Sequence, residues 1–351
     1  MKGFMLLTEP AEYTVAFTRE VLAPCGWDYA FRFGRSLAAE ESEVGALVLA
    51  QLPWWRRLHF LWQMLRAHQA IIVHSYVASS SLFLIACNLL FRKPLGIDAD
   101  DGEHVPREWL RRVVKRVWLG WLFTRPWCFG ISPGFQAHRR LFLAYGMPRE
   151  HTFTVPMCVE NARFTQALRP PRAAERPFRF GYLGRLVPHK RVEAIVEAFK
   201  LLAPGAATLE IVGEGPLRAQ LESAAGAGVK VLGPRFGAAK AAWLKGLDGL
   251  VLFSDYEPWG LVVNEALAAG VPCLVGAKVG CAADLVAGSG GGEVVPAGDV
   301  EALAEAMARW CRVGRQIESM GRDGAAFMRE RWHFGVARAC FEAMLREVAQ
   351  W

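Results

Sequence analysis

The chain has 351 residues, more than a single hydrophobic core usually organises, so we expect two domains. With 53% hydrophobic and 21% charged residues, it is not an intrinsically disordered protein. The formal net charge is +7, but no nucleic-acid recognition motif accompanies that charge, so we expect no nucleic acid among the partners.

The first half of the chain alternates short apolar runs with helical patterns, which predicts a Rossmann-like domain with a parallel sheet. This domain covers residues 1–165, and its strands are predicted at 3–7, 28–33, 46–49, 71–74, 95–99, 127–131 and 152–156. The opening residues have one lysine and a short apolar run, which is typical of a first strand and not of a signal peptide. The eight cysteines form no CxxC pair and indicate reduced thiols, so we expect a cytoplasmic protein.

The uncharged stretch at 70–91 is long enough to span a membrane. It also divides into a buried strand at 71–74, a Ser-rich turn and a helix at 82–90, which explains the pattern equally well. We therefore predict a strand and a buried helix here, and no transmembrane span.

Basic residues are concentrated in the first half, where residues 1–170 hold 20 Lys and Arg against 14 Asp and Glu. The helix predicted at 107–123 carries an apolar stripe made of Leu110, Val113, Val114, Val117 and Trp121. Beside the stripe lie Arg111, Arg112, Lys115 and Arg116, and a second basic, Trp-rich patch lies at 54–62. Either the stripe packs on the sheet while the charges are solvated, or the helix docks on an anionic membrane surface. The second alternative predicts a peripheral protein at the inner face of the membrane.

A stretch without apolar periodicity, at 165–177, separates the first domain from a second one at 178–335. The second domain opens with an apolar strand that ends in Gly184 and Arg185, and Lys190 follows just before a helix predicted at 191–202. Gly184 permits a close backbone approach. A guanidinium, an ammonium and the free N–H groups of a helix start converge there, which favours the binding of an anion.

Two carboxylates, Glu257 and Glu265, delimit the segment EPWGLVVNE. A strand predicted at 249–253 precedes this segment, and a helix predicted at 261–269 begins inside it. Glu257 is therefore expected in the loop at a strand end, and Glu265 about one turn into the helix. Open α/β sheets bind nucleotides at that edge, and carboxylates accept hydrogen bonds from hydroxyl pairs such as those of a ribose or a sugar ring.

The segment EPWGLVVNEALAAGVP resembles the signature of family 4 of the retaining glycosyltransferases, which is Glu-x-x-Gly-Leu-x-x-x-Glu. GRLVPHKRVEAIVEAF resembles the same family's Gly-Arg, short loop and Lys. The resemblance implies that Arg185 and Lys190 bind the donor diphosphate. It also implies that Glu257 contacts the donor sugar and that Glu265 holds the ribose. Further similar segments over 178–340 imply a donor site made of Gly184, Arg185, Lys190, Gly213, Arg235, Phe236, Trp259, Gly260, Leu261 and Glu265.

The resemblance further implies the α/β GT-B fold, in which two Rossmann-like doubly wound domains face a central cleft. A final helix at 336–351 would cross back to the N-terminal domain, which would bind the acceptor. The implied activity is that of a retaining hexosyltransferase, which moves a sugar from a UDP- or GDP-linked donor to a hydroxyl of a carbohydrate or lipid-linked acceptor. Such enzymes serve glycan, polysaccharide or glycolipid assembly, and the family uses no metal ion and no cofactor beyond the nucleotide sugar. A sugar-nucleotide epimerase of the same fold and a non-catalytic carbohydrate-binding relative stay open as alternatives.

The sequence departs from the family after the strand predicted at 95–99, where many members carry a histidine. By register Asp100 stands at that position, inside the acidic run 98–101. A carboxylate at a strand end can orient a sugar hydroxyl or assist deprotonation of the acceptor, so Asp100 joins Arg185, Lys190 and Glu257 as a catalytic candidate. The alternative is a polar turn that caps the next helix. An Asp-x-Asp metal site is rejected because the other motifs are those of GT-B, and His74, at another strand end, is interpreted as a core histidine.

Overall fold

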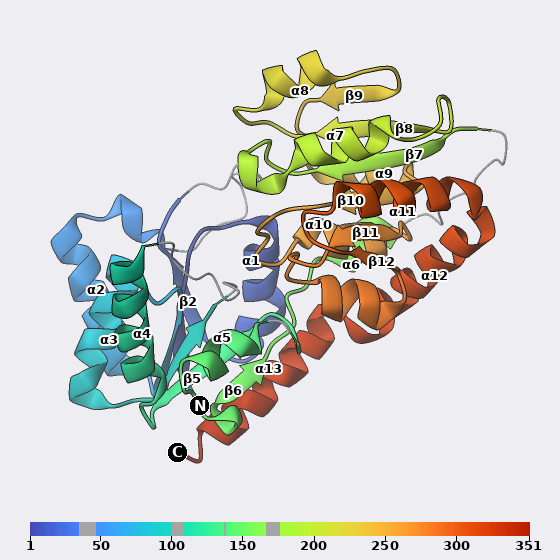
Figure 1. The fold of residues 1–351 in the computed structure, drawn as a ribbon. Helices are drawn as coiled ribbons and strands as arrows, with labels where there is room; N and C mark the ends of the chain where they lie inside the picture. Colours follow the sequence, from blue (N-terminus) through green and yellow to red (C-terminus); the bar gives the residue numbers. More distant parts are fainter. Residues whose placement is uncertain (35–46, 100–107, 137, 166–175) are drawn as a thin grey trace. The chain divides into compact units, whose positions relative to one another are not determined.

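The computed structural model describes residues 1–34, 47–99, 108–136, 138–165 and 176–351. The chain divides into two compact units. The first unit joins Met1–Val159 with Phe334–Trp351, and the second is Glu160–His333. Each unit is built on one six-stranded sheet, and every strand pair is parallel (Figure 1).

The sheet of the first unit has the order β2-β1-β3-β4-β5-β6. Its strands are β1 (Gly3–Leu7), β2 (Asp28–Phe31), β3 (Ala70–His74), β4 (Leu95–Asp98), β5 (Cys128–Ser132) and β6 (Thr152–Thr154). Strand β1 pairs with β2 on one side and with β3 on the other, so the winding direction of the chain reverses at β1. Open α/β sheets bind their ligands beside such a reversal, at the carboxyl ends of the strands.

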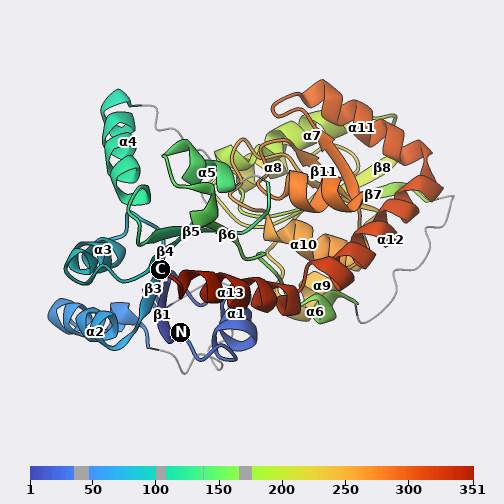
Figure 2. The same ribbon diagram turned by 90° about the horizontal axis from the view of Figure 1, so that it is seen from below.

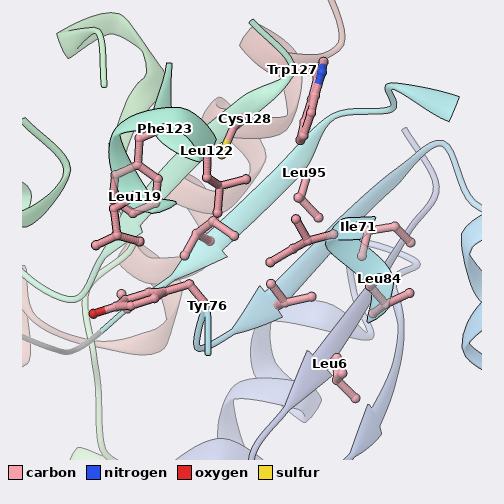
Figure 3. Packing of buried hydrophobic residues seen from close by; sticks show 14 of the residues in the cluster. Leu6, Ile71, Tyr76, Leu84, Leu95, Leu119, Leu122, Phe123, Trp127 and Cys128 are labelled. Atoms are coloured by element: carbon pink, nitrogen blue, oxygen red, sulfur yellow. The ribbon is translucent and has the colours of Figure 1, made fainter. Parts of the chain in front are cut away.

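Helices cover both faces of this sheet (Figure 2). One face carries α2 (Trp54–Ala67), α3 (Ser79–Phe91), α4 (Trp109–Phe123) and α5 (Arg139–Ala144), and a buried cluster joins them to the strands (Figure 3). The other face carries α1 (Glu12–Phe17), the π-helical turn η1 (Thr18–Leu22) and α13 (Phe334–Val348). There the ring of Phe341 packs edge to face against Phe17 and Trp27. Two short 3-10 turns are η2 (Leu49–Gln51) and η3 (Arg149–His151).

Two expectations for this unit are decided by its strands and helices. The uncharged stretch at 70–91 forms the predicted strand, β3, and the predicted helix, α3. The helix is not buried as expected, because its outer side exposes Leu89 and Leu90 at 43% and 77%. No helix in the described ranges is long and apolar enough to cross a membrane. The prediction of a strand at 46–49 is wrong for residues 47–49, the part of this range that the structure describes. Val48 makes an isolated bridge with Phe31, and the chain then turns through η2 into α2. This turn buries Leu49, so the apolar run fills the core at the sheet edge without extending the sheet.

Helix α4 packs by a side that its apolar periodicity did not indicate. The alternative in which the stripe packs on the sheet is wrong, because four of its residues are 57%, 48%, 60% and 68% exposed, namely Leu110, Val113, Val114 and Val117. The residues of α4 that enter the core are Leu119, Leu122 and Phe123. Only the C-terminal turns of α4 therefore pack against the unit, and the stripe along its first turns faces solvent.

The sheet of the second unit has the order β12-β11-β10-β7-β8-β9. Its strands are β7 (Phe178–Leu183), β8 (Ala207–Val212), β9 (Val229–Leu232), β10 (Gly249–Leu252), β11 (Cys273–Gly276) and β12 (Gly292–Val295). Strand β7 pairs with β8 on one side and with β10 on the other, so the winding reverses between β7 and β10. The carboxyl ends of these two strands are the expected ligand edge.

The helices of the second unit also lie on both faces of its sheet (Figure 2). Helices α7 (Val192–Lys200) and α11 (Val300–Arg312) pack together on one face, where Trp310 lies against Phe178. On the other face Gly181 leaves room for the end of α9 (Gly237–Lys245) and the residues after it, since a Cβ there would lie 2.4 Å from the Leu247 side chain and 2.9 Å from the Trp243 ring. The helical segments that remain are α6 (Asn161–Thr165), η4 (Pro188–Lys190), α8 (Arg218–Ala224), α9 (Gly237–Lys245), α10 (Leu261–Ala268), η5 (Ala282–Ala287) and α12 (Gly314–Arg331).

Candidate active site

Two cations follow the carboxyl end of β7. Arg185 lies two residues beyond the strand and is exposed, and its guanidinium makes no ion pair within the described ranges. Lys190 closes the turn η4 and is buried, with 7% of its surface exposed. The next residue, Arg191, has the left-handed φ of 52° and is the N-cap of α7. The tight turn thus directs a buried ammonium to the strand edge and leaves a guanidinium in solvent beside it.

Glu257 is the partner of Lys190. Their side chains form a direct ion pair and are 13% and 9% exposed, respectively. Glu257 lies in the loop after β10, and its backbone pairs with Val279 in a parallel bridge. Because β10 and β7 are neighbours at the winding reversal, the ion pair lies at the expected ligand edge.

The electrostatics of His189 show that these charges share one environment. Burial lowers the pKa of His189, and the positive charges of Lys190 and Arg185 lower this pKa further. The carboxylates of Glu257 and Asp255 act in the opposite direction and are the weaker influences. The lowered pKa of His189 favours its neutral form at pH 7.

Tyr182 and two glycines fix the loop that carries Arg185. The Tyr182 hydroxyl donates a hydrogen bond of 3.0 Å to the carbonyl oxygen of Arg185. A Cβ added at Gly184 would lie 2.7 Å from that hydroxyl, and one added at Gly213 would lie 1.9 Å from the Gly184 carbonyl oxygen. The loop after β8 therefore lies directly on the loop after β7, and neither glycine position has room for a side chain.

Glu265, in α10, has a cationic partner that the sequence did not reveal. Its Oε1 lies 2.6 Å from Nζ of Lys240, and both side chains are 10% exposed. Lys240 lies in the first turn of α9, and its backbone N–H donates to the carbonyl oxygen of Phe236. The loop with Arg235 and Phe236 thus leads directly into α9, the helix whose Lys240 pairs with Glu265. Nothing in the spacing of GAAKAAWLK distinguishes Lys240 from a solvated lysine.

The remaining donor-site candidates begin α10. The Trp259 indole is 2% exposed and donates from Nε1 to Asn264 Oδ1 at 2.9 Å. Gly260 has a φ of 99°, and a Cβ there would lie 3.1 Å from Val279, so this position requires glycine. Leu261 is the first residue of the helix. The Trp259 ring therefore packs inside the unit and helps to hold the strand-to-helix loop in place.

Two further observations concern residues at strand ends. Ser254, which follows β10, is 2% exposed, and its hydroxyl has no hydrogen-bond partner within the described part of the chain. No sequence motif marks this serine. Asp100 lies outside the described residues, so its predicted role stays a prediction.

The chain is similar to several glycosyltransferases. Residues 177–312 match the family model described as glycosyl transferases group 1. A GDP-mannose-dependent alpha-mannosyltransferase of Mycobacterium tuberculosis (strain CDC 1551 / Oshkosh) is 33% identical over 163 residues, which cover 45% of this chain and 42% of the relative. The chain thus matches less than half the length of that relative.

Two solved structures resemble the whole chain. One is HepE of Anabaena in complex with UDP, with a TM-score of 0.77, 17% identity, and coverage of 99% of this chain and 100% of the other. The second is sucrose-phosphate synthase of Thermosynechococcus elongatus, with a TM-score of 0.72, 18% identity and full coverage of both chains. At these identities the likeness establishes the fold. Residues 177–312 are therefore similar to the glycosyl transferases group 1 family, and the chain has the GT-B fold of two Rossmann-like domains.

Proposed function

We propose that the protein is a retaining glycosyltransferase that moves a sugar from a nucleotide diphosphate sugar to an acceptor hydroxyl. The observation that carries the proposal is the grouping of Arg185, Lys190 and Glu257 where the winding reverses between β7 and β10. The mannosyltransferase relative is named for GDP-mannose, and HepE was solved with UDP. Both names support a nucleoside diphosphate donor and leave its base open.

Arg185 and Lys190 stabilise the negative charge that develops on the leaving diphosphate. Cations that are already fixed in position act strongly on such charge and need no rearrangement during the reaction. Lys190 is held by Glu257 before any ligand binds, so its ammonium is already in position. The N–H groups at the start of α10 add to the same phosphate site.

The two carboxylates recognise hydroxyl groups of the donor. Glu257 accepts hydrogen bonds from the transferred sugar, and Glu265 accepts them from the ribose. The ion pair with Lys240 holds the Glu265 carboxylate in place on α10. With retention, the donor phosphate itself takes the proton of the acceptor hydroxyl.

Nucleoside diphosphate binding tests the donor site. UDP or GDP at about 100 times its Kd should raise the melting temperature of the protein by roughly 5–10 °C. Arg185→Ala should remove most of that rise and leave the unliganded melting temperature unchanged, because Arg185 is exposed. Arg179→Ala is the matched control, since Arg179 lies near the other end of β7 and pairs with Glu210. Equal nucleotide shifts in both variants would refute the assignment of Arg185.

Product analysis separates the three functional classes. A transferase releases nucleoside diphosphate and forms a glycoside only when an acceptor is present. An epimerase forms a new sugar from the donor alone. A non-catalytic carbohydrate-binding relative forms no product, whether the donor is present alone or together with an acceptor.

We also propose that the first unit contacts an anionic membrane surface and takes a lipid-linked acceptor from it. The first turns of α4 expose Trp109 and an apolar stripe, with Arg111, Arg112 and Arg116 exposed alongside. On the same face of the sheet, α2 exposes Trp54 and Trp55 (Figure 2). Anionic lipid headgroups complement the cations, and tryptophan and valine enter the interface between headgroups and acyl chains. Binding to anionic vesicles is the property that tests this contact.

A further inference from the structure

The ring of Trp259 is held from two directions inside the second unit. Its Nε1 donates to Asn264 Oδ1, in the first turn of α10, at 2.9 Å. Its face lies against the indole of Trp332, with ring centroids 5.8 Å apart and an angle of 17° between the ring planes. Trp332 in turn stacks on Phe327, with centroids 5.9 Å apart and an angle of 24°. Because Trp259 follows Glu257 by two residues, this stack acts on the loop that carries the donor-site candidates.

Helix α12, which ends directly before Trp332, runs along α10 in the opposite direction. A Cβ added at Gly321 would lie 2.3 Å from the carbonyl oxygen of Gly270, which follows the C-terminal end of α10. Further along the chain, Trp332 contacts Trp259, which precedes the N-terminal end of α10. The close contact between the two glycines therefore fixes how far α12 reaches along α10, and with it the place of the Trp332 ring.

The backbone of Trp332 is tied to the place where the chain enters the second unit. Asn161 is the second residue of that unit, and Trp332 is its last residue but one. Asn161 Nδ2 donates to the carbonyl oxygen of Trp332 at 3.0 Å and to that of Met328 at 2.8 Å. The last carbonyls of a helix lack intrahelical donors, so this one amide group closes the end of α12 and fixes the backbone of Trp332.

We propose that Trp332 is a positioning residue of the donor site, and that Asn161 holds it in that role. The Trp332 ring keeps Trp259 in place, and Trp259 keeps the loop 257–260 in the conformation that receives the transferred sugar. Trp332 is 2% exposed, so it acts through Trp259 and not by contact with the donor. A displacement of about 1 Å in a positioned group can cost about a hundredfold in rate. The inference rests on the proposed glycosyl transfer and names the residues that shape its sugar-binding loop.

Hydrogen exchange measures the support of the loop without any ligand. In Trp332→Leu the amides of residues 255–264 should exchange at least about fivefold faster than in the wild type. Trp332→Phe keeps an aromatic stack and should stay closer to the wild type. Trp310→Leu is the matched control, because Trp310 is 1% exposed in the same unit but packs on Phe178, at the opposite edge of the sheet. This control should leave exchange in the loop unchanged.

Nucleotide sugars measure the same support in the donor site. UDP-glucose is compared with UDP, and GDP-mannose with GDP, in binding titrations on the full chain. Trp332→Leu should weaken binding of the nucleotide sugar at least about fivefold more than binding of the nucleoside diphosphate. The reason is that Glu257 is assigned to the sugar, whereas Arg185 holds the diphosphate from a different loop. Asn161→Ala leaves every ring intact and should act in the same direction with a smaller effect.

Calorimetry shows whether each variant is folded, and Asn161→Ala takes the place of Trp332→Leu if the latter is not. The proposal is overturned if Trp332→Leu leaves exchange in the loop as in the wild type, or if Trp310→Leu raises it equally. Equal losses of affinity for the nucleotide sugar and the nucleoside diphosphate would also overturn it. Absence of nucleotide binding in the wild type would instead refute the donor assignment, and the exchange comparison would still decide about Trp332.

Discussion

The ion pair of Lys190 and Glu257 is nearly buried, which determines both its net contribution to stability and the cost of removing one partner. Nearly buried ion pairs add little net stability, because desolvation of both charges offsets their attraction. Removal of one partner is costly, since the other charge is then left without compensation. The pair is therefore better explained as a way to keep an ammonium dehydrated and in place for an anionic ligand.

A double-mutant cycle checks this interpretation. Lys190→Met should destabilise the protein by about 3 kcal/mol, because it leaves the Glu257 carboxylate unpaired at 13% exposure. The double variant Lys190→Met/Glu257→Gln should recover at least about half of that loss, because no charge remains. Chemical denaturation provides the measurement. Additive losses would show that the two side chains are not coupled.

The places of Arg185, Lys190 and Glu257 at strand ends could be predicted, because glycine turns and apolar runs mark where a strand stops. The structure has Arg185, Lys190 and Glu257 at the ends of β7 and β10. Lys240 could not be predicted, since its partnership with Glu265 depends on how α9 packs beside α10, which no local pattern encodes. The contact of His74 Nδ1 with Asp98 Oδ2, at 3.0 Å, could not be predicted either, because the register between β3 and β4 is a property of the sheet.

At the scale of elements, the loop after β8 is tied to the loop after β7 by contact between glycines. Gly213→Ala should lower the melting temperature by roughly 3–10 °C and weaken nucleotide binding, because its Cβ would lie 1.9 Å from the Gly184 carbonyl oxygen. Gly226→Ala is the control, since the nearest atom to its Cβ would be 3.9 Å away. Calorimetry and nucleotide titration measure both effects. A Gly213→Ala protein as stable as Gly226→Ala would contradict the predicted clash.

Helix α4 illustrates a limit of periodicity. Its sequence is apolar on more than one side, so the pattern predicts a helix and cannot say which side packs. The residues of α4 that pack in the core are Leu119, Leu122 and Phe123, and the larger apolar stripe is exposed to solvent. The choice depends on which turns of the helix lie over the sheet, and this is a tertiary property.

The exposed stripe of α4 gives a prediction for membranes. Val113→Ser/Val117→Ser should reduce sedimentation with phosphatidylglycerol vesicles several-fold, because valine is exchanged for a side chain with little affinity for the interface. Phosphatidylcholine vesicles should bind the wild type weakly, and added salt should weaken the anionic interaction. Both valines are at least 48% exposed, so the melting temperature should stay the same. Undiminished binding by the variant would show that the stripe is not the contact.

At the scale of the whole molecule, the chain leaves the first unit at Val159 and re-enters it at Phe334. Helix α13 contributes Phe341 to the core of that unit, at 1% exposure. Phe341→Ala should therefore lower the unfolding transition of the first unit by roughly 10 °C, from about 3–5 kcal/mol of lost packing. Phe33→Ala, at 54% exposure, should have little effect. Differential scanning calorimetry tests this, and a shift of less than 2 °C for Phe341→Ala would contradict it.

The overall architecture could be predicted because alternating strands and helices with short connections allow few topologies. The order of the strands in each sheet, and the turn at Leu49–Gln51 in place of a strand, could not be predicted. Strand order depends on crossovers between distant segments, and a short apolar run fits a strand and a buried turn equally well.

The return of α13 also has a consequence for synthesis. On a ribosome, Glu160–His333 emerges as one uninterrupted segment and can complete its sheet while the chain is still growing. The earlier-made Met1–Val159 must wait for Phe334–Val348 before Phe17 and Trp27 gain their last neighbour. The half that is translated first therefore completes its core last, because Phe17 and Trp27 stay uncovered on that face until α13 has been made.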